Sequence, residues 1–109
     1  MTVDFTLVIG ASLIAEDGQF LGKVCDEFDQ DSILNEFGDY GSEFSEKSIR
    51  NDFSDYGSEF SHKSAYNEFT MTPPRLINGK ILIGYVTKNE FLSPGVDPDV
   101  LIDWAKTNL

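Results

Sequence analysis

The sequence of 109 residues predicts an α+β fold in one domain, and three observations lead to this prediction. Two apolar segments are each interrupted by a tight turn, Asp17-Gly18 and Asn78-Gly79, and such turns are strong signals for β-hairpins. Between them lies a tandem repeat of 16 residues, and after them a helix-start signal at Asp97-Pro98. We therefore expect a small antiparallel sheet, short-turn repeats and a C-terminal helix.

The first part of the chain, residues 2–28, is expected to hold a strand and a hairpin. Val3 to Ile9 alternates apolar with mostly polar residues, which is typical of a strand. Residues 13–28 and 76–91 share one pattern: an apolar run, a Gly turn, a second run with an inner Gly, and a final acid–Phe pair. We therefore expect a second, related hairpin over residues 73–92.

Residues 29–72 form the repeat segment. SILNEFGDYGSEFSEK at residues 32–47 is followed by SIRNDFSDYGSEFSHK at residues 48–63, with 12 of 16 positions identical, and a third copy begins at Ser64. Each copy opens with Ser before an apolar residue or Ala, with Asn three positions on. Because Ser and Asn readily cap turns, this pattern favours short turns.

A continuous helix is the alternative, because the spacing of Ile33, Phe37 and Tyr40 fits a helical period. Gly38 and Gly41 argue against it, since each would cost about 1 kcal/mol inside a helix. We favour short turns. The pattern leaves open whether the copies stack as a solenoid or form an irregular cap over the sheet.

The last element is a helix over residues 97–109. Asp97 can cap its first turn and Pro98 fits the first helical position. Leu101, Trp104 and Ala105 then fall on one face, which we expect to pack on the sheet.

At this point the residues show a resemblance. The pattern S-I-x-N-x-F-x-x-Y-G-S-x-F-S, followed by an S-x-x-N copy and Pro-Pro, resembles small bacterial proteins with tandem Y-G-S repeats. It covers roughly residues 13–91. The resemblance implies repeats placed between two short hairpins, and it carries no catalytic or binding residues over to this chain.

Charge excludes several classes of partner. The net charge is −11, and residues 26–69 hold twelve of the acidic side chains, three of the basic ones and nine of the fourteen aromatic rings. A surface of this sign repels nucleic-acid phosphates and anionic membranes, so we expect neither as a direct partner. A basic protein is the partner that the charge favours.

Targeting and redox signals are sparse. Asp4 precedes the apolar stretch over residues 5–15 and no Lys or Arg does, so the basic region of a signal peptide is missing. Cys25 is the one cysteine and has no partner for an internal disulfide. These features predict a cytoplasmic protein with no membrane span.

Catalytic and metal motifs are equally weak. His62 stands where the first copy has Glu46, which indicates a solvated position, and with Cys25 it does not make a zinc or catalytic set. Calcium ligation by the acidic run that starts at Asp26, and by the acids beside each Tyr-Gly-Ser turn, stays an alternative. We expect no enzyme activity and no cofactor.

The repeated polar and aromatic residues have structural explanations. Asn35, Asn51 and Asn67 recur in register, and we expect their amides to bond to the backbone of the turns. The Phe and Tyr stripes are expected mainly in the core, because aromatic rings dominate burial. Any exposed remainder would mark an interface.

The function that we predict is a protein-interaction module that uses an acidic, aromatic-rich repeat surface. Alternatives are an acidic inhibitor that occupies a nucleic-acid site on another protein, and a calcium- or ligand-binding domain. The candidate binding residues recur in register on the two complete copies; they are Asp39, Tyr40, Glu43, Asp55, Tyr56 and Glu59.

Overall fold

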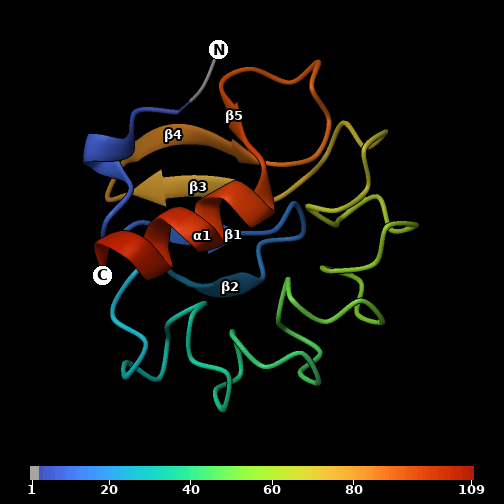
Figure 1. Cartoon of the computed structure of the whole chain (residues 1–109). Helices are drawn as coiled ribbons and strands as arrows, with labels where there is room; N and C mark the ends of the chain where they lie inside the picture. Colours follow the sequence, from blue (N-terminus) through green and yellow to red (C-terminus); the bar gives the residue numbers. More distant parts are fainter. Residues whose placement is uncertain (1–2) are drawn as a thin grey trace.

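The computed structural model describes residues 3–109 and has an α+β fold with a five-stranded sheet and one C-terminal helix (Figure 1). This confirms the predicted fold class. The strands follow the order β2-β1-β3-β4-β5 in the sheet. The bounds are η1 Phe5–Leu7, β1 Ser12–Ile14, β2 Phe20–Lys23, β3 Arg75–Asn78, β4 Ile81–Val86, β5 Gly95–Val96 and α1 Pro98–Asn108.

Both predicted hairpins are present, β1–β2 and β3–β4. Gly18 and Gly79 in their turns have φ of +87° and +62°, a conformation that favours glycine over every other residue. β1 also pairs antiparallel with β3, which joins the two hairpins into one sheet. The two-residue strand β5 runs parallel to β4 and was not predicted.

The predicted N-terminal strand over Val3 to Ile9 is wrong. This segment contains the 3-10 helix η1 instead. The Asp4 carboxylate accepts hydrogen bonds from the N–H and the hydroxyl of Thr6, and the Leu7 N–H bonds to the Asp4 carbonyl. Local capping by Asp4 therefore closes a turn and outweighs the alternation of apolar residues.

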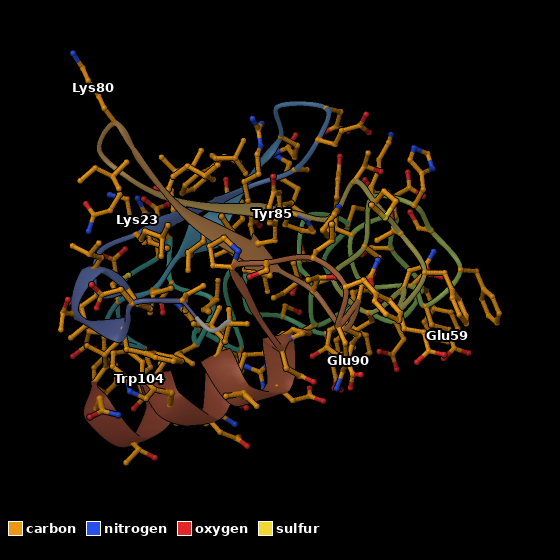
Figure 2. All side chains as sticks on the ribbon, turned by 90° about the horizontal axis from the view of Figure 1, so that it is seen from above. Lys23, Glu59, Lys80, Tyr85, Glu90 and Trp104 are labelled. Carbon is orange, nitrogen blue, oxygen red and sulfur yellow. The ribbon has the colours of Figure 1, made fainter. Side chains whose placement is uncertain are left out.

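Helix α1 covers one face of the sheet, as Figures 1 and 2 show. The Asp97 carboxylate accepts from the Asp99 N–H at 2.8 Å, so the predicted cap is confirmed. Leu101 and Ala105 are buried in the core, and the Trp104 ring lies 5.1 Å from the ring of Phe5. No helix within the described residues has the length and apolar character that crossing a membrane requires.

The repeat segment is a chain of consecutive β-turns, which we call the turn ribbon (residues 26–72). The ribbon contains fourteen such turns. In thirteen of them the N–H of the last residue donates to the carbonyl of the first residue, at 2.9–3.3 Å. We call the residue at which each turn begins its corner. At every corner except Gly38, a short polar side chain accepts a hydrogen bond from the N–H of the residue two positions later. The helical alternative is therefore wrong.

The turns divide the ribbon into two complete copies of 16 residues, over 26–41 and 42–57, and a shorter third copy over 58–72. The two complete copies have five turns each, of which the last is one residue longer, and the third copy has four. The glycine of each Tyr-Gly-Ser lies in this longer turn. A larger residue does not fit there, because a Cβ on Gly41 or Gly57 would collide with the carbonyl oxygen of Asn35 or Asn51, respectively. The repeat therefore begins earlier, and extends further, than the sequence match indicates.

The ribbon is fixed to the sheet near both of its edges, and Figure 1 shows it curving from β2 around to the end of β4. At one edge the Lys23 N–H donates to the backbone carbonyl of Asp31, and the Lys23 carbonyl accepts from the Ile33 N–H. Beyond the end of β4 the Lys88 N–H donates to the carbonyl of Ala65. Ile33, Ile49 and Ala65 hold the same place in the three copies and are fully buried. The repeats thus form a regular arc around the sheet.

Candidate functional site: the outer face of the turn ribbon

The aromatic residues of the ribbon divide by type, and the prediction that both stripes lie in the core is wrong for phenylalanine. Of the nine Phe residues in the chain, seven are 82–98% exposed. Six of these hold the third residue of the first or fourth turn of a copy, which points away from the sheet. We call the seven the phenylalanine row: Phe28, Phe37, Phe44, Phe53, Phe60, Phe69 and Phe91.

Each member of the phenylalanine row directly follows an acidic residue in the chain. Phe91 lies outside the ribbon but copies its geometry, because its N–H bonds to the side chain of Asn89 as the Phe69 N–H bonds to Asn67. Asn89 also donates to the carbonyl of Thr70, which attaches this turn to the end of the ribbon. The row is therefore a repeated pairing of carboxylate and exposed ring.

The tyrosines of the repeats point the other way. The Tyr40 ring packs edge-on against Phe20 at 4.9 Å, and the Tyr56 hydroxyl donates to Asp17 at 2.8 Å. Burial, and then the hydrogen bond to Asp17, raises the pKa of Tyr56 to about 12. The tyrosines therefore attach the ribbon to the β1–β2 hairpin.

Between the exposed rings lie three open hollows that share walls. The first holds Phe37 and Phe44, the second Phe53 and Phe60, and the third Phe69 and Phe91. The first and second share Asp52 and Tyr66, and the second and third share Glu68, Phe69 and Lys88. We call the three hollows together the groove.

Carboxylates dominate the groove. Three basic side chains line it, Arg50, Lys88 and Lys106. Helix α1 contributes two of the acids, so the first hollow lies between the ribbon and this helix. Figure 2 shows Glu59 and Glu90 at one end of the molecule and Lys80 at the opposite end. The lining carboxylates are Glu36, Glu43, Asp52, Glu59, Glu68, Glu90, Asp99 and Asp103.

The six candidate residues from the sequence fall into three environments. Glu43 and Glu59 are exposed and line the first and second hollows. Asp39 and Asp55 are exposed but line neither of these hollows. Tyr40 and Tyr56 are half-buried against the β1–β2 hairpin, in the contacts described above. The binding role of the acids stays a prediction.

The repeated asparagines bond to the backbone, as expected from the sequence. Asn51 donates to the carbonyl of Ser45 at 3.0 Å and accepts from the Phe53 N–H at 3.0 Å. Asn35 and Asn67 make the same two bonds in their copies. Each amide thus holds the turn that presents an exposed ring of the phenylalanine row.

A polar cluster joins the ribbon to the start of α1 on the groove wall. The Tyr66 hydroxyl donates to Asp99 at 2.7 Å, and Lys88 Nζ lies 2.8 Å from Asp99 and 2.9 Å from Asp97. The hydrogen bond from Lys88, and then that from Tyr66, holds the pKa of Asp99 below its usual value. Burial, and then the bond to Asp99, raises the pKa of Tyr66. This cluster keeps one cation beside an aromatic ring.

The other chemistry-bearing residues lie apart. His62 is exposed, with its Nε2 3.8 Å from Glu16, and Cys25 is half-buried, with burial raising the pKa of its thiol. Between residues 3 and 109, no three His, Cys, Asp or Glu side chains come together so as to hold a metal ion. The groove is thus the feature of the described chain that offers both shape and charge.

The sequence carries a further signal for the ribbon, a three-residue period of short polar residues. The corners of four successive turns are Ser42, Ser45, Ser48 and Asn51. The residue two positions after a corner points outward, except where the turn faces the sheet. Counting this period would have placed the Phe residues on the outside.

Comparison with known protein families, curated proteins and solved structures finds no match.

Proposed function

We propose that this protein is a non-enzymatic interaction module that binds a basic protein partner along the groove. The observation that supports this is the pairing of an exposed Phe ring with a carboxylate, repeated at six rings that line one continuous groove. Single exposed apolar residues are ordinary on protein surfaces. A regular series held outward by the turn geometry is not scatter, and it fits an interface.

Burial of the rings supplies the attraction. Covering one exposed Phe side chain contributes about 1.5–3 kcal/mol, so a partner that covers two or three gains a substantial part of a binding free energy. The cost of ordering is low, because hydrogen bonds already fix the turns that carry the rings. Aromatic residues are typical of the centre of an interface.

Charge selects the class of partner. Eight carboxylates and three basic side chains line the groove, and the whole chain carries −11. A positively charged protein is attracted and oriented by this field, whereas a second copy of the chain is repelled. The acidic-inhibitor alternative stays a prediction, and the rings between the carboxylates favour a partner with apolar groups over a purely phosphate-binding site.

The proposal is tested with a peptide of about 20 residues rich in Lys, Arg and Ala, the size of one side of a protein interface. We expect salt-sensitive binding, weakened at least about tenfold when four rings are removed in F37A/F44A/F53A/F60A. E43K/E59K should weaken it similarly, since it reverses two carboxylates of the groove.

Two matched controls separate the groove from the rest of the surface. I81A/L82A removes two half-exposed apolar side chains of β4, and E46K reverses an exposed acid on the ribbon away from the groove. Both should bind as the wild type does. Equal affinity of all the variants would contradict the proposal.

A further inference from the structure

One of the three basic side chains that line the groove, Lys88, shows the chemistry of the site. Lys88 Nζ lies 5.7 Å from the centre of the Tyr66 ring while it pairs with Asp97 and Asp99 at 2.9 and 2.8 Å. The ammonium group is therefore placed between an aromatic face and two carboxylates, where ring and charge attract it together. Tyr66 and Lys88 both line the second hollow.

The phenylalanine row offers the same two groups without a cation. Among the described residues, none of the carboxylates that precede the six rings in the groove forms an ion pair. The rings themselves are almost fully exposed. Each unit is therefore an open aromatic face next to an unpaired carboxylate; the acids are Glu36, Glu43, Asp52, Glu59, Glu68 and Glu90.

We infer that the groove recognises an arginine-rich segment of a protein, and that its hollows take guanidinium groups in preference to ammonium groups. This inference rests on the proposed function and names the chemistry of the partner. A guanidinium group is planar, stacks on aromatic faces and can bond to a carboxylate through two N–H groups at once. An ammonium group is more strongly hydrated, so it gains less from an exposed ring.

The shared walls of the hollows indicate that the segment is extended. Asp52 and Tyr66 line both the first and the second hollow, and Phe69 and Lys88 line both the second and the third. A chain that leaves one hollow therefore enters the next without crossing another surface. Binding of one arginine raises the local concentration of the next, which makes the contacts of neighbouring hollows act together.

The test compares nona-arginine with nona-lysine, which carry the same charge, on the intact protein. We expect nona-arginine to bind about tenfold more tightly, from two or more guanidinium–ring contacts. F53A/F60A and F37A/F44A should each weaken the binding of nona-arginine. With all four rings removed, the two peptides should bind with equal affinity. I81A/L82A should keep the full preference.

The outcomes separate the two proposals. Equal binding of both peptides to the wild type, still weakened by removal of the rings, overturns the arginine preference and leaves the basic-partner function standing. A preference for arginine that survives removal of the four rings also overturns the inference, because its origin then lies elsewhere. If only one of the two ring-pair variants weakens the binding of nona-arginine, the inference that the bound segment is extended is overturned. Absence of binding by either peptide, together with no binding of the mixed basic peptide, contradicts both proposals.

Discussion

The sheet with α1 and the turn ribbon are held together by different forces. The body buries a continuous apolar core that includes Leu13, Leu76 and Leu101. The ribbon buries little more than one apolar or Ala side chain in each copy and is fixed by hydrogen bonds from corner side chains to the backbone. Because the ribbon's shape does not depend on its outward rings, those rings are available for a partner.

The same comparison holds inside one copy of the repeat. Ile49 lies on the inner side of a turn and is fully buried, whereas Phe53, four residues later, is almost fully exposed. The three-residue period sets which side chain points inward, so a large aromatic side chain of the copy lies in water. Residue type alone therefore does not reveal burial in such a ribbon.

The largest effect on stability is expected from Ile49→Ala, which leaves a cavity between the ribbon and the body. We expect a loss of about 3 kcal/mol in the free energy of unfolding, measured in urea. Ile81→Ala removes the same atoms from an exposed position on β4 and should change it by less than about 0.5 kcal/mol. Equal losses in the two variants would show that the ribbon does not pack as described.

Asn51→Ala comes next, because it removes both backbone bonds of a buried amide. We expect a loss of about 2 kcal/mol, since the Phe53 N–H loses its acceptor and the Ser45 carbonyl keeps only the bond from the Ser48 N–H. Asn35→Ala removes the same bonds from a less buried copy, where the bond to Asp29 is longer at 3.3 Å, and should cost less. A larger loss in Asn35→Ala would contradict the role given to burial.

A smaller effect, with a defined pH dependence, is expected from Tyr56→Phe. Loss of the bond to Asp17 should cost about 1 kcal/mol near neutral pH. The folded pKa of Tyr56 is raised from 10.0 to about 12, so its contribution is complete below pH 10 and is lost as the pH rises to 12. The difference in unfolding free energy between wild type and variant should therefore vanish in that window. A difference that persists above pH 12 would contradict this assignment.

The body was largely predictable from sequence, because its signals are local. The glycine turns at Gly18 and Gly79 and the Asp97-Pro98 cap each fix an element through its own residues. The N-terminal segment was not predicted, since the Asp4 side chain bonds to its own backbone and overrides the alternation. Strand β5 is two residues long and has no pattern of its own.

The site was predicted only in part. Acid and aromatic enrichment indicated the ribbon as the candidate binding surface, but the helical spacing of Ile33, Phe37 and Tyr40 obscured the shorter period of the corners. Tyr40 and Tyr56 recur as regularly as the Phe residues and yet face inward. Repetition in sequence shows that a position has a constant environment, and not whether that environment is protein or water.

We expect the outward rings to contribute nothing to the stability of the fold, and the unfolding free energy of F53A/F60A measures whether they do. We predict a value within about 0.5 kcal/mol of the wild type, because both rings are exposed in the native state. A loss of about 3 kcal/mol or more for each ring, as expected for buried Phe, would contradict this expectation and place the phenylalanine row in the structural core.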